Sequence, residues 1–354
     1  MVIIVATNID AICGTWSPVK VFQYLTIFSL FAMLALALPA EELLYHKSDN
    51  FSPVRYYFNA AFDVIQNPNY FSQSDYLAKH KRLMKRLASP LHNIKRRGGW
   101  GELFKQEFAS GRLLPNVALH LLGSGYDYRY IEEYYRWHKF KYPRLLSTLT
   151  LYMGHLGNEA LELSNDQITI FDHFADLFVF DVLAIWLFQY DQVVELFHHQ
   201  LGMRRWAYQP FFDLQHGQIR NAGLNYILRP SLTSSKWRPI FMTGMQTMIG
   251  TSYNYHGLKN ISLLSGVAFT DPLERKGYMV GALYLDNGRL PEFSITINGS
   301  ENYSVRCNLY PALLANYFPS FQEQQMSLTF GHSRQQEMVI AINYNLPLGV
   351  GVVW

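Results

Sequence analysis

The sequence predicts an α+β protein in which an N-terminal helical domain precedes an antiparallel β domain. Apolar residues recur at helical spacings from about residue 55 to residue 215. From about residue 219 the period changes to two, which is typical of strands. Only 16% of the 354 residues are charged and 16% are aromatic, which favours a protein in partial contact with lipid. A soluble protein with a large core is the alternative.

The first forty residues predict a secretory signal peptide. After Lys20 comes VFQYLTIFSLFAMLALALPA, an apolar run that follows a positive charge and ends in small residues. Ala35 and Ala37 form an A-x-A cleavage pattern, and Ala40 offers a second cleavage position. An uncleaved membrane anchor is the alternative. Either reading places the bulk of the chain outside the cytoplasm, in a Gram-negative periplasm or outer membrane.

Residues 41–215 are predicted to form a helical domain in the periplasm or at a membrane interface. Stretches such as YPRLLSTLTLYMGHLGNEALEL and FDHFADLFVFDVLAIWLFQYDQVVELFHHQL are long and carry apolar residues at helical spacings. Pro115 and Pro143 lie near predicted helix starts, where the missing N–H is harmless. Asn165 and Asp166 predict a turn between two helices.

Residues 216–354 are predicted to form the β domain. FSITI, YSVRCNL and MSLTF alternate apolar with polar residues, so each strand has one apolar face that is either half-buried or lipid-facing. Asp286-Asn287-Gly288 and Asn298-Gly299-Ser300 predict hairpin turns. The span is long enough for about eight strands in a meander or small barrel. A soluble β-sandwich packed on the helices is the alternative.

The segment LPLGVGVVW predicts a strand with an apolar stripe and a terminal aromatic residue. The residues of that stripe are Leu346, Leu348, Val350, Val352 and Trp354. Over about ten residues it resembles the closing strand of Gram-negative outer-membrane β-barrels. The resemblance implies an insertion signal and a closed barrel, because an open strand edge cannot be satisfied in lipid.

Three consecutive apolar helices carry acidic or imidazole side chains. Asp172 and Asp176 are four residues apart and share a helix face, whereas Asp181, five residues further, points towards a neighbouring face. His155 and Glu159 are also four apart on the preceding helix. A buried carboxylate without a partner is costly, so such groups must pair, take up a proton or bind a cation.

We therefore predict that five residues converge as a candidate catalytic site: His120, His155, Glu159, Asp172 and Asp176. Imidazole and carboxylate ligands suit Zn²⁺, Fe or Mn²⁺. The predicted metal ligands are His155, Glu159, Asp172 and Asp176. Without a metal, a His–carboxylate pair could serve as a general base. The alternatives are a buried polar network that fixes helix packing and a site for lipid headgroups.

The same helices resemble uncharacterised bacterial envelope proteins and VanZ-like membrane proteins. The resemblance extends over about 70 residues, and the matching positions are His120, Glu159 or Glu162, Asp172 and Asp176. It implies an envelope location rather than a particular reaction. His173 and the pair His198-His199 do not belong to this pattern and are predicted to be capping or surface residues.

The stretch KHKRLMKRLASPLHNIKRRGG predicts a basic amphipathic helix. Arg82, Lys85 and Arg86 group on one side of it, which favours contact with anionic phospholipid. A solvated basic face is the alternative. The net charge of +3 implies no strong attraction to nucleic acid.

Two functions are compatible with these observations. The first is a bacterial cell-envelope protein with a structural, assembly or lipid-contacting role and membrane lipid as its partner. The second is a membrane-interface hydrolase that acts on lipid or cell-wall material through the His/Glu/Asp cluster, with a divalent metal as its cofactor. The sequence contains no P-loop, no dinucleotide-binding fingerprint and no G-x-S-x-G motif.

Overall fold

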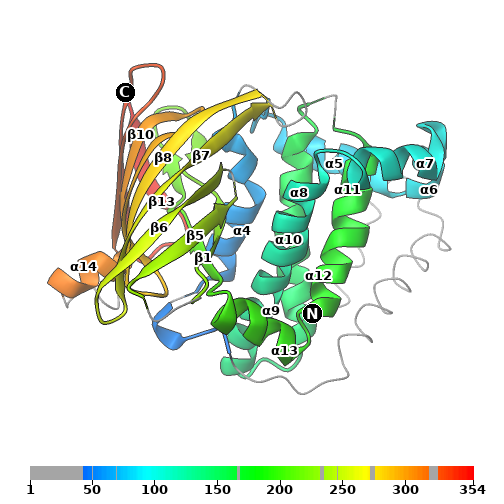
Figure 1. The fold of residues 1–354 in the computed structure, drawn as a ribbon. Helices are drawn as coiled ribbons and strands as arrows, with labels where there is room; N and C mark the ends of the chain where they lie inside the picture. Colours follow the sequence, from blue (N-terminus) through cyan, green and yellow to red (C-terminus); the bar gives the residue numbers. More distant parts are fainter. Residues whose placement is uncertain are drawn as a thin grey trace. The chain divides into compact units, whose positions relative to one another are not determined.

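Helices occupy the first part of the chain and strands occupy the second in the computed structural model (Figure 1). The structure describes residues 43–49, 51–68, 70–165, 168–231, 235–244, 246–271, 276–318 and 326–354. The predicted signal peptide and its cleavage positions lie outside these residues. The prediction of an α+β protein is confirmed.

Several helices begin at a proline, where the ring fits the first turn and no N–H is lost. The helical segments are η1 (Lys47–Asp49), α4 (Pro53–Ala61), η2 (Asp63–Gln66), α5 (Tyr76–Leu87), α6 (Pro90–Arg96), α7 (Gly99–Leu103), η3 (Phe104–Phe108), α8 (Leu113–Pro115), η4 (Asn116–Gly123), α9 (Ser124–Trp137), α10 (Pro143–Glu162), α11 (Ile170–Ala175), η5 (Asp176–Phe180), α12 (Asp181–Leu187), α13 (Asp191–Glu195), η6 (Leu196–Gln200) and α14 (Pro311–Tyr317). Within the described ranges, no helix is both long enough and apolar enough to cross a membrane.

Four of these segments, η3 to η6, are π-helical. They continue neighbouring α-helices, because the residues at the junctions keep right-handed helical backbone angles. Thus α8, η4 and α9 form one helix, and α11, η5 and α12 form another. π-Helical turns inside α-helices are rare and often occur at functional sites.

The strands form one mixed sheet. They are β1 (Arg204–Ala207), β2 (Phe211–Asp213), β3 (Gln218–Arg220), β4 (Leu224–Leu228), β5 (Trp237–Thr243), β6 (Gln246–His256), β7 (Lys259–Asp271), β8 (Lys276–Asp286), β9 (Pro291–Ser300), β10 (Tyr303–Leu309), β11 (Ser327–His332), β12 (Met338–Asn343) and β13 (Gly349–Val353). Their order is β1-β4-β5-β6-β7-β8-β9-β10-β11-β12-β13-β2-β3, and among the described strands only the β13–β2 pair is parallel. The predicted number of about eight strands is too low, since the described residues already form 13 strands of the sheet.

Strand structure begins at Arg204, before the predicted start of the β domain at residue 216. The predicted turn at Asp286-Asn287-Gly288 does separate β8 from β9, and Gly288 has a φ of +88°. The hairpin predicted at residues 298–300 does join β9 to β10, but its turn lies at residues 301–302, because β9 continues through Ser300. Asn298 instead has a positive φ inside that strand, of a kind that Asn tolerates.

The sheet is not closed, since β1 and β3 stand at its two ends. The β1–β4 pair and the β2–β3 pair nevertheless belong to one antiparallel register. Arg204 pairs with Ile227 in β1–β4, and seven residues later Phe211 pairs with Arg220, seven residues before Ile227, in β2–β3. Residues 204–228 therefore form one long hairpin with an irregular middle. One side of the hairpin pairs with β13 and the other pairs with β5.

Apolar side chains cover the open face of the sheet. The covered face is mixed, with buried polar residues on β9 to β11 and a buried apolar cluster on β5 to β8. In β9, Glu292, Ser294 and Thr296 are buried, whereas Ile297 is 51% exposed. The exposed large apolar residues of the strands include Ile249, Leu263, Met279, Ile297, Val305, Phe330, Ile340, Ile342, Val350 and Val352. The predicted alternation is thus confirmed, including that of β13, and the apolar face is the exposed one.

The helical part packs on the sheet through α4, which lies between the strands and α10 (Figure 1). Gly157 of α10 allows this close approach, because a Cβ there would lie 2.5 Å from Cβ of Ala61. On the sheet side, Asn59 accepts a hydrogen bond from the backbone N–H of Gly223 at 2.9 Å. The hydroxyl of Tyr226 in β4 donates to Asp127 of α9 at 2.8 Å. The long hairpin is therefore one part of the sheet that contacts the helices, and Arg306 of β10, which donates to Gln66 of η2 at 3.2 Å, is another.

Candidate functional site

The five predicted site residues lie in one buried polar region between three helices. His120 lies on η4, His155 and Glu159 lie on α10, and Asp172 and Asp176 lie on the helix formed by α11, η5 and α12. His120 is partly exposed and the other four are buried. Within this region the side chains form two distinct groups.

The first group contains His120, His155 and Asp181, whose candidate ligand atoms all lie within 4.8 Å of one another. Nδ1 of His155 lies 2.6 Å from Oδ2 of Asp181. Nδ1 of His120 lies 3.4 Å from Oδ1 of the same carboxylate. Nε2 of His120 lies 3.7 Å from Oδ2 of Asp176, so Asp176 stands at the edge of this group.

The second group contains Glu159, Asp172 and His173, again with all candidate ligand atoms within 4.8 Å. Nδ1 of His173 bonds to Glu159. Arg112 donates to Asp172 and to Glu107, at 2.8 Å in both cases. This group therefore already contains a permanent positive charge.

Sequence reasoning misplaced Asp181. On an α-helix, a residue five positions after Asp176 would point towards another face. The intervening segment η5 is π-helical, and its i→i+5 hydrogen bonds bring residues five apart into line. Asp181 consequently faces the two histidines and is fully buried. A single sequence gives no clear signal for a π-helical turn.

His173 was also misjudged, because it is fully buried and bonded rather than a capping or surface residue. His198 is buried as well, and its Nδ1 lies 2.8 Å from the hydroxyl of Tyr126, whereas His199 is exposed. The predicted metal ligands are divided between the two groups: His155 and Asp176 belong to the first, and Glu159 and Asp172 belong to the second.

The carboxyl groups of the cluster differ in the direction in which their pKa values are shifted. Burial raises the pKa of Asp176 well above its usual value, and Asp172 and Glu159 raise it further against the opposing effect of His120. Burial and Asp172 together raise the pKa of Glu107 to about 7, in spite of Arg112. The region thus holds more negative groups than its arginine can neutralise.

The pKa values of Asp181 and His120 are shifted so that both groups favour their charged forms. Burial would raise the pKa of Asp181, but His155 and His120 outweigh it and hold this pKa below its usual value. Burial would lower the pKa of His120, yet Asp176 and Asp181 raise it to about 10. The first group therefore favours a negative Asp181 next to positive charge.

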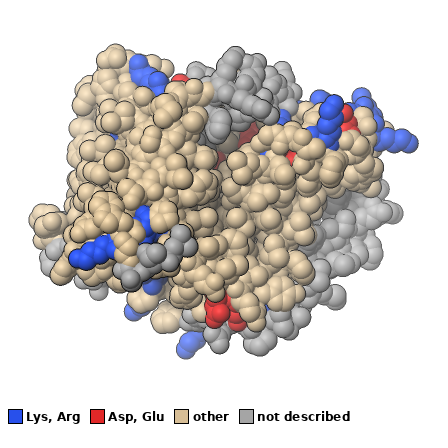
Figure 2. All heavy atoms as spheres, viewed as in Figure 1, with Lys and Arg blue, Asp and Glu red and all other residues tan. Residues whose placement is uncertain are grey.

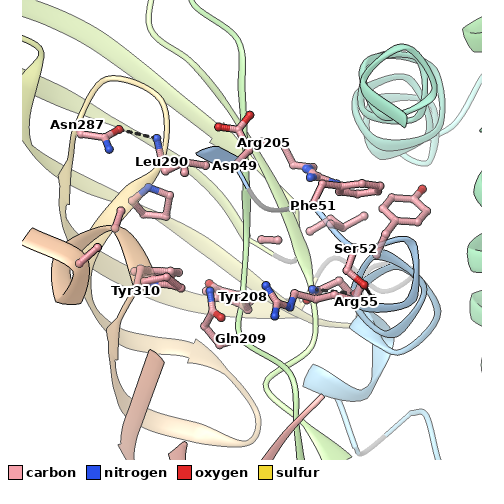
Figure 3. A pocket seen from close by; sticks show the side chains of 18 residues that line it. Asp49, Phe51, Ser52, Arg55, Arg205, Tyr208, Gln209, Asn287, Leu290 and Tyr310 are labelled. Carbon is pink, nitrogen blue, oxygen red and sulfur yellow. Dashed lines mark hydrogen bonds between the residues drawn. The ribbon is translucent and has the colours of Figure 1, made fainter. Parts of the chain in front are cut away.

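A separate cavity of about 350 Å³ opens between the start of α4, β1 and α14 (Figure 3). Arg55 and Arg205 flank it, together with aromatic residues such as Phe51 and Tyr310. Both arginines are already engaged: Arg55 donates to the carbonyl of Leu346 at 2.7 Å, and Arg205 stacks on Phe51 at 5.1 Å. The cavity could take an anionic amphiphile, but its charges are partly satisfied.

No family model matches the chain, and neither a curated protein nor a solved structure matches it significantly.

Proposed function

We propose that this chain is an exported protein of a Gram-negative envelope whose sheet forms a β-barrel in the outer membrane. Its role would be structural, in assembly or in lipid contact, with membrane lipid as the partner. The observation that carries the proposal is the exposed face of the sheet, on which large apolar side chains recur from strand to strand.

An apolar outer face of this extent is not expected for a sheet in water. A sheet in water places its apolar face on the core and its polar face in solvent. Here Ile249, Leu263 and Met279 on three adjacent strands are 69%, 63% and 67% exposed. A continuous exposed apolar surface of this kind marks a contact with membrane or protein. Membrane barrels have an apolar outer band and a polar interior.

The long hairpin supports closure of the barrel. Its first strand pairs with β13 through β2, and its second strand pairs with β5 through β4. The hairpin therefore joins the first and last strands of the rest of the sheet. If residues 204–213 and 218–228 are each counted as one strand, every strand has a neighbour on both sides. A sheet in lipid needs this arrangement, because no water is present to satisfy an open edge.

The distribution of charge also supports a membrane location. On the face shown in Figure 2, Lys, Arg, Asp and Glu lie mainly near the ends of the elements, and broad uncharged areas separate them. Lys81, Arg82 and Lys85 of α5 are exposed, as is Leu77 one turn before them. A basic surface with an adjacent apolar residue suits anionic headgroups at the edge of a bilayer.

The proposal is tested by placing a charge on the exposed face of β7. Leu263→Arg puts a guanidinium in the middle of a strand, where a bilayer would penalise it by about 2–4 kcal/mol. Leu258→Arg is the matched control, because Leu258 is 74% exposed but lies in the turn between β6 and β7. We expect Leu263→Arg to lower the unfolding free energy in lipid vesicles and Leu258→Arg to leave it nearly unchanged.

In water both substitutions should be nearly neutral, because each replaces an exposed side chain. The barrel proposal is wrong if the mature protein stays in the soluble fraction and both variants match the wild type. Heat-dependent gel mobility in detergent supplies an independent readout. The hydrolase alternative draws on the helical cluster instead, and it stays a prediction.

A further inference from the structure

We propose that His120, His155, Asp176 and Asp181 form a binding site for one divalent transition-metal ion. This inference concerns the helical part and does not depend on membrane insertion. It differs from the sequence prediction, because it uses Asp181 and leaves Glu159 and Asp172 outside the ligand set.

The contacts of His155 are the first step. Its Nδ1 lies 2.6 Å from Oδ2 of Asp181, whereas its Nε2 lies 3.5 Å from the hydroxyl of Ser124, at the limit for a hydrogen bond. The Ser124 hydroxyl donates to the carbonyl oxygen of Leu119 at 3.2 Å, so its oxygen can accept a proton from Nε2 when a metal ion occupies Nδ1.

The 2.6 Å contact between Nδ1 of His155 and Oδ2 of Asp181 requires a proton or a metal ion between the two atoms. A proton on Nδ1 satisfies the contact in the metal-free protein, and a bound metal ion would take its place. The surroundings of His120 favour the metal ion.

His120 directs each of its two ring nitrogens towards a carboxylate. The distances are 3.4 Å to Asp181 and 3.7 Å to Asp176, which are too long for good hydrogen bonds. Oδ1 of Asp176 has no hydrogen-bond partner, although only 4% of this residue is exposed. A buried carboxylate oxygen without a partner costs free energy, and a metal ion would satisfy it.

The charge of the group fits one divalent ion. Two carboxylates and two neutral imidazoles carry a net charge of −2. The neighbouring group around Asp172 has Arg112 at 2.8 Å, and Nε2 of His173 lies 3.3 Å from Arg86. Arginine thus contacts the second group, whereas the first group offers two metal-ligating imidazoles. This contrast selects the first group as the site.

The ligand types define the class of ion. Two nitrogen and two carboxylate donors suit Zn²⁺, Fe²⁺ or Mn²⁺, whereas Mg²⁺ and Ca²⁺ prefer oxygen ligands alone. Exposure of about 19% of the His120 side chain gives an ion a route from the surface.

The test is metal binding by the purified full-length mature protein after treatment with a chelator. Co²⁺ serves as a visible probe for the Zn²⁺ site, and equilibrium dialysis with Zn²⁺ gives the stoichiometry. We expect one equivalent to bind, with a Co²⁺ absorption spectrum typical of low coordination. His120→Asn should weaken binding at least tenfold, because it removes an imidazole from a partly exposed position.

The matched control is His173→Asn, which removes a buried imidazole from the second group. It should keep one equivalent of metal with an affinity within about threefold of the wild type. Circular dichroism shows whether each variant is folded. If either variant fails to fold, the wild-type stoichiometry and a Co²⁺ spectrum with nitrogen ligation decide the question. No binding by the wild type, or loss of binding in the folded His173→Asn protein, would overturn the proposal.

Discussion

Asp286 in the sheet and Asp181 in the helical part are both fully buried carboxylates, yet the side chains that they contact differ in kind. Arg229 donates to both oxygens of Asp286, at 2.7 and 2.8 Å. The side chain of Asn260 and the backbone N–H of Gly288 add two further donors. Asp181 has only imidazoles as charged partners, namely His155 and His120.

The comparison teaches that burial alone does not indicate function. The partner of Asp286 is the guanidinium of Arg229, a permanent cation that cannot ligate a metal ion. Both carboxylate oxygens of Asp286 accept hydrogen bonds. We interpret that pair as a structural element that ties β8 to the hairpin. The partners of Asp181 can lose protons and ligate a metal, and the neighbouring Asp176 is incompletely satisfied. Chemistry is therefore expected in the helical part.

Asp286→Ala tests the sheet side of the comparison and should have the largest effect. It leaves the charge of Arg229 buried without its partner, which should cost about 3–5 kcal/mol of unfolding free energy. Denaturant unfolding measures the loss. The double variant Asp286→Leu with Arg229→Met is the control and should recover much of it. A single variant as stable as the wild type would contradict the assignment of a structural pair.

Asp181→Asn tests the helical side and should have an intermediate effect. In the metal-free protein it weakens the contacts with two imidazoles, at a cost of about 1.5–3 kcal/mol. It should also abolish metal binding, whereas Asp286→Ala, if it folds, should not. Measuring stability and bound Zn²⁺ on the same samples compares the two carboxylates directly. Equal metal binding by Asp181→Asn and the wild type would remove the distinction between the two carboxylates.

Glu107 gives the smallest effect per pH unit, which is visible as a slope of stability against pH. Its pKa is raised to about 7 in the folded protein, against a usual value of 4.5. The folded state therefore holds this proton more tightly, so the stability that Glu107 contributes is complete below pH 4.5 and is lost as the pH rises to 7. The slope should be roughly 1 kcal/mol per pH unit.

The control for this slope is Glu107→Gln, which stays uncharged and should flatten the curve of the metal-free protein between pH 4.5 and 7. Unfolding midpoints at several pH values give the comparison. An unchanged slope in the variant would assign the pH dependence to other carboxyl groups of the cluster.

The fold class and the alternation of the strands could be predicted because both depend on local periodicity. Which face of each strand lies outward could not, since a period of two is the same for either orientation. In FSITI, Phe293, Ile295 and Ile297 share a face, and only the surrounding sheet decides that this face is open. The long hairpin at 204–228 was missed because its strands are short and interrupted.

Helical spacing is enough to predict that polar residues from these helices converge, but not to predict which residues belong to the cluster. His120, His155 and Asp176 were identified because they lie on apolar helices with regular spacing. Asp181 required knowledge of the π-helical turn, and Arg112 required knowledge of how two distant segments pack. Neither property is local in sequence.

The parallel pairing of β13 with β2 has a consequence for the order of folding. Gly349 pairs with Phe211, so this junction joins segments that are roughly 140 residues apart, and such long-range pairs form late and slowly. Until then β2 and β13 each lack one neighbour. Unpaired strands of this kind bind other chains readily. A chain that ends before Gly349 would leave β2 and β12 without their β13 neighbour, and such fragments should aggregate.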